Sequence, residues 1–263
     1  RIIAKIENQQ GVDNLDEILE HAYGIMVARG DLAVEIPFEK IPGVQREIID
    51  KCNKRKKPVI IATQMLHSMI KNPRPTRAEV NDVASAVYRR TDAVMLSGET
   101  AYSKYPVESV ATMSKIASEV EKTKTNNLEM PVFVINTKVS DYLAKYAVEA
   151  SLELEARAIV ADTNTGRTIR ALAGYQGPKP VFAICYSAKT MRQLALSYGV
   201  FPIYMKPKAT THEFIQKALQ NLMEDYDFNN EDLVVILAGN FGVGRGASYI
   251  EIGTVSNLMS LEE

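Results

Sequence analysis

The sequence predicts an α/β protein with two consecutive sets of β-strands and helices. Two observations support this fold class. Short apolar runs alternate with amphipathic stretches along the 263 residues, a pattern typical of parallel sheets covered by helices. In the first half the repeating unit is about 23 to 35 residues long, which suits a βα module.

The first half contains four predicted βα units. Apolar runs predict strands at residues 2–6, 25–28, 59–62 and 93–96. Amphipathic stretches predict helices at residues 12–22, 38–54 and 78–90, and a further helix from about Pro106. Thr76 and Glu79 form a capping-box pattern at the start of the third helix. Basic residues at 51–57 are interpreted as cations at a helix C-terminus, where the helix dipole favours them.

The polar stretch at residues 122–127 is the predicted domain boundary, which divides the chain into residues 1–125 and 126–263. In the second domain we expect strands at residues 158–161, 181–185, 201–205, 233–237 and 249–252. We expect helices at residues 139–153, 168–173, 188–196 and 211–223. Five strands interleaved with helices make a complete small α/β domain with a mostly parallel sheet. The four units of the first half do not complete a barrel, which needs eight.

Composition argues against several classes of protein. The formal charge of −1 gives no electrostatic reason to expect a nucleic-acid or membrane partner. No apolar run approaches the roughly 18 residues of a membrane span, and no secretory signal opens the chain. Cys52 and Cys185 belong to no CxxC pattern, which favours a reducing, cytoplasmic location. Because the chain begins at Arg1, inside a strand and without Met, we expect a piece of a longer protein.

The first strand carries two charged residues, Lys5 and Glu7. Side chains at i and i+2 of a strand point to the same face, so these two project together. Ionised groups are costly to bury unless they are paired or used. The pair by itself is equally consistent with a structural ion pair and with a functional site.

Charged or polar residues occur at the ends of all four strands, at 5–7, 28–31, 62–64 and 97–100. The C-terminal ends of parallel strands converge, and sites are built there from several strands. We expect Glu7 and Asp31, on consecutive strands, to offer oxygens to one Mg²⁺ or Mn²⁺; no His or Cys lies nearby to indicate zinc. Lys5 is placed to neutralise charge on a transferring phosphoryl group or a developing enolate.

Three further residues complete this candidate site. Gly30 permits close backbone approach to an anion, and the hydroxyls of Thr63 and Ser97 can position a substrate or relay a proton. Taken singly, the motif at residues 29–32 is typical of a turn before a helix, and the one at 97–100 of a helix cap. Their occurrence at successive strand ends favours a functional site.

Five segments closely resemble pyruvate kinase and follow that family's order: residues 3–8, 26–32, 61–66, 73–79 and 95–100. The second half resembles the C-terminal domain of the same family. The resemblance implies that the first half is the C-terminal half of a (β/α)8 TIM-type barrel. It also implies phosphoryl transfer from phosphoenolpyruvate to ADP, which gives pyruvate and ATP in the last step of glycolysis.

The resemblance also implies cofactors and the charged part of the site. Glu7 and Asp31 match the family's ligands for Mg²⁺ or Mn²⁺. Lys5 matches the lysine that stabilises phosphoryl transfer and the enolate. In the family the K⁺ site and much of the nucleotide site lie in segments that precede the motif of Lys5. We therefore expect this chain alone to be inactive.

Other positions match residues of the substrate site and of a subunit contact. Gly30, Asp31 and Thr63 match residues around the substrate carboxylate. Thr63 and Ser97 match hydroxyls implicated in protonating the enolate. Arg77 matches an arginine that reaches across a subunit interface, which fits the homotetramers of the family.

A candidate effector loop follows the first predicted strand of the second domain and comprises Thr163, Asn164, Thr165, Gly166, Arg167 and Thr168. Hydroxyls and free N–H groups at a helix N-terminus form a phosphate cradle. The loop resembles the one that holds a sugar-phosphate effector, often fructose 1,6-bisphosphate, although Asn164 and Arg167 depart from the hydroxyl-rich pattern. The glycine-rich segment 239–246 either closes over such a ligand or only connects two strands.

Two other functions remain open. The chain can act as a non-catalytic module for effector binding and oligomerisation. A metal-dependent aldolase or lyase would also place a Glu and an Asp on neighbouring strand ends. The lysine two residues before Glu7, together with the motif at 97–100, argues against the aldolase or lyase.

Overall fold

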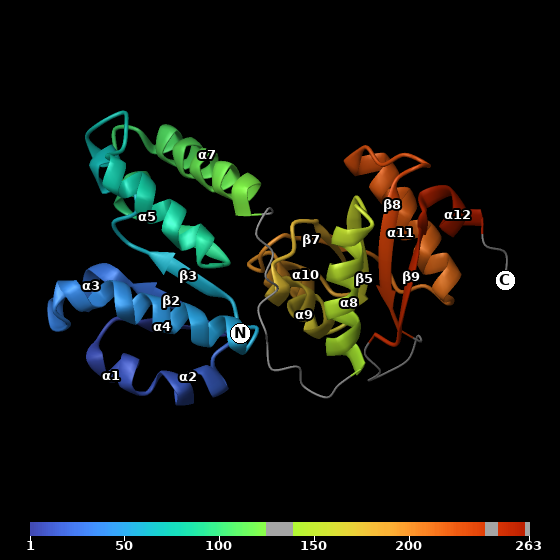
Figure 1. The fold of residues 1–263 in the computed structure, drawn as a ribbon, viewed down its shortest axis with the longest axis horizontal. Coiled ribbons are helices and arrows are strands. Elements are labelled where there is room, and N and C mark those ends of the chain that lie inside the picture. Colours follow the sequence, from blue (N-terminus) through green and yellow to red (C-terminus); the bar gives the residue numbers. More distant parts are fainter. Residues whose placement is uncertain (125–138, 240–246, 261–263) are drawn as a thin grey trace. The chain divides into compact units, whose positions relative to one another are not determined.

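The computed structural model describes residues 1–124, 139–239 and 247–260. The chain divides into two compact units, Arg1–Glu129 and Met130–Glu263 (Figure 1). The boundary predicted between residues 125 and 126 falls outside the described residues and stays a prediction. Within the described ranges, no helix combines the length and the apolar character needed to span a bilayer.

The first unit is built on a sheet of four parallel strands in the order β1-β2-β3-β4. The strands are β1 (Ile3–Ile6), β2 (Gly24–Ala28), β3 (Val59–Ala62) and β4 (Ala93–Met95). The helices between and after them are α1 (Gln9–Asp13), α2 (Leu15–His21), α3 (Arg29–Glu35), η1 (Phe38–Lys40), α4 (Ile41–Lys54), η2 (His67–Ile70), α5 (Arg77–Tyr88), α6 (Gly98–Ala101) and α7 (Pro106–Lys124). The parallel sheet of an α/β fold is therefore confirmed.

The two faces of this sheet have different environments. Ile6, Val27 and Ile61 lie in one row across the sheet and are buried against side chains of α2, α4 and α5. Lys5 and Met26 belong to the neighbouring row, on the opposite face, where Met26 is only partly buried and Lys5 is exposed. Because all four strands run the same way, the polar residues that follow them lie along one edge of the sheet.

Two predicted helices of the first unit are interrupted. The single helix predicted at residues 12–22 is divided, because α1 ends before Asn14, whose φ and ψ of −99° and 17° separate it from α2. The stretch 38–54 divides into η1 and α4, and Pro42 stands in the first turn of α4, where its missing N–H costs nothing. The capping box of Thr76 and Glu79 at the start of α5 is confirmed.

The second unit contains a mixed sheet of five strands in the order β7-β6-β5-β8-β9. The strands are β5 (Ala158–Thr163), β6 (Val181–Cys185), β7 (Val200–Tyr204), β8 (Leu233–Ala238) and β9 (Tyr249–Thr254), and β9 is antiparallel to β8. The helices are α8 (Val139–Glu153), α9 (Arg167–Tyr175), α10 (Ala188–Leu194), α11 (Thr211–Tyr226) and α12 (Val255–Ser260). Alternate residues of β5 pack into two separate cores, which include α8 and α9 on one face and α11 and α12 on the other.

Candidate active site at the strand ends

Lys5 joins two carboxylates at the edge of the first sheet. Its ammonium nitrogen forms an ion pair with Glu7, just past the end of β1, and lies 2.8 Å from Oδ2 of Asp31. Asp31 follows the end of β2 and lies in the first turn of α3. All three side chains remain about half exposed, at 49%, 43% and 54%. The pair predicted from the strand pattern is therefore part of an open, three-residue cluster.

The electrostatics of this cluster favour a charged lysine. Hydrogen bonds to Asp31 and then to Glu7 raise the pKa of Lys5 above its ordinary value. The shift belongs to an exposed group, so solvent screens its contribution to stability. The raised pKa reflects the contact of the Lys5 ammonium with two carboxylate oxygens, one from Asp31 and one from Glu7.

The donor set of the cluster fits a hard divalent cation. Two carboxylates from different elements meet at one point, occupied here by the Lys5 ammonium. Across the parts of the chain that the structure describes, no group of three or more His, Cys, Asp or Glu side chains could hold a metal. Mg²⁺ commonly takes one or two carboxylates and completes its octahedron with waters and substrate oxygens. Glu7 and Asp31 are therefore a suitable partial set for Mg²⁺ or Mn²⁺.

Gly30 and Thr63 are brought into direct contact. The backbone N–H of Gly30 donates a 2.8 Å hydrogen bond to Oγ1 of Thr63, whose hydroxyl in turn donates to the carbonyl oxygen of Ala62 at 2.7 Å. A Cβ added to Gly30 would lie 3.4 Å from Oγ1 of Thr63, an ordinary contact distance. Packing within this unit therefore does not by itself require glycine at position 30.

Thr63 and Gln64 adopt an unusual backbone conformation at the end of β3. Their φ values are 68° and 55°, in the left-handed region, which is strained for a β-branched residue such as Thr63. Such strain persists only where surrounding contacts hold it, and it concentrates at functional sites. The left-handed backbone of Thr63 and Gln64 therefore supports including this turn in the candidate site, independently of any sequence motif.

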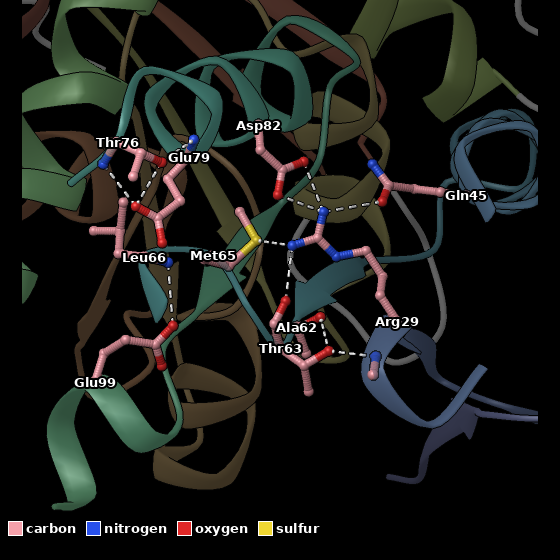
Figure 2. Close-up of polar contacts among 11 residues, drawn as sticks. Arg29, Gln45, Ala62, Thr63, Met65, Leu66, Thr76, Glu79, Asp82 and Glu99 are labelled. Carbon is pink, nitrogen blue, oxygen red and sulfur yellow. Dashed lines mark hydrogen bonds and ion pairs between the residues drawn. The ribbon is translucent and has the colours of Figure 1, made fainter. Parts of the chain in front are cut away.

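Arg29 supplies those contacts, as Figure 2 shows. Its Nη2 donates to the carbonyl oxygen of Thr63 at 2.7 Å, and its Nη1 contacts both carboxylate oxygens of Asp82 in α5 at 2.6 and 2.7 Å. Nη1 also reaches Oε1 of Gln45 in α4 at 3.5 Å. The Arg29 side chain is only 11% exposed. Sequence reasoning left Arg29 without a role, because Asp82 is 53 residues away and no local pattern links them.

Glu99 supports the other end of the same loop. Its carboxylate accepts a hydrogen bond from the N–H of Leu66 at 3.1 Å (Figure 2). It also accepts one from the N–H of Ser97 at 2.9 Å, and the residue is only 2% exposed. Ser97 occupies the N-cap position of α6, but its side chain forms no capping hydrogen bond. The motif at 97–100 therefore joins the segments that follow β3 and β4 through Glu99 and does more than cap a helix.

Arg77 belongs to a different element from the Lys5 cluster. It is the first residue of α5 and is exposed. A groove of about 590 Å³ runs along α5 and is lined by side chains of that helix between Ala78 and Arg89. Neither Lys5 nor its two carboxylates line this groove.

The candidate effector loop lies between β5 and α9. Thr163 is buried and its Oγ1 accepts a 2.8 Å hydrogen bond from the N–H of Gly166, which has a left-handed φ of 80° and is the N-cap of α9. Thr168 is also buried. The exposed residues of the loop are Asn164, Thr165 and Arg167. Residues 240–246 of the predicted glycine-rich segment lie outside the described residues.

A partly buried acid next to this loop had no sequence signal. Asp162 precedes Thr163 in β5, and Oη of Tyr186 donates to its Oδ2 at 3.2 Å. Burial raises the pKa of the Asp162 carboxyl to about 6, against the opposing effect of the Tyr186 hydrogen bond. Burial also raises the pKa of the Tyr186 phenol, and the neighbouring Asp162 adds to that shift.

Comparisons with known proteins agree with these two units. The model of the pyruvate kinase barrel domain matches residues 1–110, and that of the pyruvate kinase alpha/beta domain matches residues 141–252. Pyruvate kinase of Borreliella burgdorferi is 46% identical over 98% of the chain and 55% of its own length; that of Clostridium acetobutylicum is 46% identical over 91% and 51%. The enzyme of Bacillus licheniformis is 43% identical over 99% and 45%. The chain spans about half the length of these curated relatives.

Proposed function

Because the chain belongs to the pyruvate kinase family, a family of phosphotransferases, we propose that the protein it forms part of transfers a phosphoryl group from phosphoenolpyruvate to ADP. The products are pyruvate and ATP, and the reaction is the last step of glycolysis, which takes place in the cytoplasm. The observation that carries this proposal is the convergence of Glu7 and Asp31 on the ammonium of Lys5.

Each member of the cluster has a role in this proposal. Glu7 and Asp31 hold Mg²⁺ or Mn²⁺, which supplies positive charge to the phosphoryl and enolate oxygens when bound. Lys5 neutralises negative charge on the phosphoryl group as it moves and on the enolate left behind. Because all three side chains are half exposed, a substrate can reach them from solvent.

The neighbouring turn orients the organic part of the substrate. The backbone at Gly30 and Asp31, at the start of α3, and the hydroxyl of Thr63 contact the substrate carboxylate. Thr63 and Ser97 lie at the ends of two neighbouring strands and deliver a proton to the enolate, directly or through water. The network of Arg29 and Glu99 keeps this part of the site rigid, as accurate positioning requires.

The four parallel strands form the C-terminal half of a (β/α)8 barrel in this proposal. Support comes from the barrel-domain match and from the partly covered face that carries Met26 and Lys5. The complementary strands, the K⁺ site and much of the nucleotide site lie in the part of the relatives that this chain does not span. The chain by itself is therefore expected to be inactive.

The second unit serves regulation and assembly in this proposal. The loop at residues 163–168 binds a sugar phosphate through the exposed side chains of Asn164, Thr165 and Arg167 and through N–H groups at the start of α9. Arg77, exposed beside the groove of α5, contacts a second subunit of a homotetramer. The domain division at residues 125/126 is part of the same proposal.

The experiment measures pyruvate formation from phosphoenolpyruvate and ADP with Mg²⁺ and K⁺. It compares the full-length protein that contains this chain, its Lys5→Met variant and a Lys51→Met control. Lys51 lies between the carboxylates of Asp16 in α2 and Glu47 in α4. We expect activity in the full-length protein, a loss of at least about a hundredfold for Lys5→Met, and little change in the control. An inactive full-length protein, or an active Lys5→Met variant, would overturn the proposal.

A further inference from the structure

The position between Glu7 and Asp31 has two candidate occupants. In the structure the Lys5 ammonium contacts both carboxylates. In the proposed function the same carboxylates hold a divalent cation. A metal–oxygen distance near 2.1 Å and the Lys5–Asp31 distance of 2.8 Å both require close approach to the same two carboxylates. The Lys5 ammonium and a divalent ion cannot both occupy that position. The two positive charges would repel each other, and each would lose contacts with the carboxylates to the other.

We propose that Lys5 is an internal cation that occupies the metal position, and that a divalent ion binds Glu7 and Asp31 only after the Lys5 side chain has left it. This inference rests on the proposed assignment of the two carboxylates to the metal. It adds a competition between Lys5 and the ion, so that Lys5 sets how tightly the site binds metal.

The surroundings of Lys5 allow such an exchange. Its side chain is 49% exposed, and a lysine is a compact point charge on a flexible four-carbon stem. Arg29 is a contrasting case, since its side chain is 11% exposed and contacts residues of α4, of α5 and of the turn after β3. A cation held only by two exposed carboxylates can leave; one held like Arg29 cannot leave without disrupting the fold.

The exchange has a consequence for ligand binding. Once displaced, the Lys5 ammonium is close to the site but has lost both carboxylate partners. A phosphorylated ligand supplies a new anionic partner, so such a ligand and the metal should each strengthen the binding of the other. Without Lys5, the metal should bind tightly even when no phosphorylated ligand is present.

The test is a titration of the full chain with Mn²⁺ alone, followed by electron paramagnetic resonance of the free ion. Lys5→Met is compared with wild type and with Lys51→Met. Lys51 is a matched control because its ammonium also bridges two carboxylates, Asp16 and Glu47, each at 2.9 Å, and Asp16 keeps its contact with Arg55 after the change. Both substitutions remove one positive charge.

We expect the Mn²⁺ dissociation constant of Lys5→Met to fall roughly tenfold, as two exposed ion pairs no longer compete, while Lys51→Met stays at the wild-type value. Adding Glu7→Gln and Asp31→Asn to Lys5→Met should abolish the gain. Unchanged or weaker binding in Lys5→Met, with binding still lost in the carboxylate variants, would overturn the competition but leave the metal assignment intact. Absence of carboxylate-dependent binding in every variant would overturn both.

Discussion

The guanidinium of Arg29 donates a 2.7 Å hydrogen bond to the carbonyl oxygen of Thr63, a residue held at a φ of 68°. Arg29 starts α3 and Thr63 follows β3, so this contact joins the segments after two neighbouring strands. The same guanidinium pairs with Asp82 of α5. A single buried side chain thus fixes the strained turn of the candidate site.

Replacing Arg29 by Lys should destabilise the first unit. An ammonium cannot reproduce the planar fork that reaches Thr63 and Asp82 at once, and it leaves part of a partly buried ion pair unsatisfied. We expect a loss of about 2 to 4 kcal/mol in the free energy of unfolding. Urea denaturation measures it, and amide hydrogen exchange at residues 63–66 locates it.

Arg46→Lys is the control for this prediction. Arg46 lies on α4, is 65% exposed, and faces Asp50 at 3.9 Å, so its replacement should change stability by less than about 0.5 kcal/mol. If Arg29→Lys is as harmless as Arg46→Lys, Arg29 does not hold the turn.

Two glycines should respond to alanine with opposite signs. At Gly24 a Cβ would lie 2.5 Å from the backbone carbonyl oxygen of Pro58, the acceptor that pairs with the N–H of Ile25. Gly24→Ala must therefore distort the β2–β3 pairing and should cost about 1 to 3 kcal/mol. At Gly43, exposed in α4, nothing lies within 4 Å of the added Cβ, so Gly43→Ala should stabilise by about 0.5 kcal/mol. Thermal unfolding of both variants checks the signs; equal shifts would contradict the account.

Asp162 should contribute a specific pH dependence to the second unit. Burial raises its pKa in the folded state from 3.8 to about 6, so the folded state binds the proton more tightly than the unfolded state. The stabilisation is fully present below about pH 4 and is lost as the pH rises through about 6. In wild type this lowers the free energy of unfolding by about 2 kcal/mol between pH 4 and 8. The Asp162→Asn variant should not show this decrease.

The measurement is hydrogen exchange of the β5 and β6 amides across this pH range, corrected for intrinsic rates. Asp225→Asn, at an exposed position of α11, should keep the wild-type profile. A pH profile of Asp162→Asn that coincides with wild type would show that the surroundings of Asp162 do not raise its pKa.

Both cysteines should be unreactive in the folded chain. Burial raises the pKa of Cys52 to about 12 and of Cys185 to about 11, and both are fully buried. The thiolate is the reactive form, so an aromatic disulfide reagent at pH 8 should label neither thiol until denaturant is added, and both thereafter. Rapid labelling of the native chain would contradict this burial.

The repeating pattern of strands and helices was predictable because it is local. The limits of β3 and β6 agree with the apolar runs at residues 59–62 and 181–185. The break at Asn14 was not predictable in the same way, since the apolar positions on either side of it stay in phase with one helical face. Helix α12 was also missed.

The charged cluster was predictable from strand geometry, but its supports were not. Lys5 and Glu7 share a face by their spacing alone, and the site was expected at the strand ends. The contacts of Arg29 with Asp82, and of Glu99 with Leu66, join residues 53 and 33 positions apart. Only tertiary packing decides such partners, so no periodicity in the sequence indicates them.

Mn²⁺ binding to the single variants Glu7→Gln and Asp31→Asn is the direct test of whether these two carboxylates together hold one divalent cation. We expect one Mn²⁺ per chain in wild type, weakened at least about tenfold by either substitution, with Asp16→Asn in α2 as an unaffected control. A Mn²⁺ affinity that is the same in wild type and in both site variants would contradict this shared metal site.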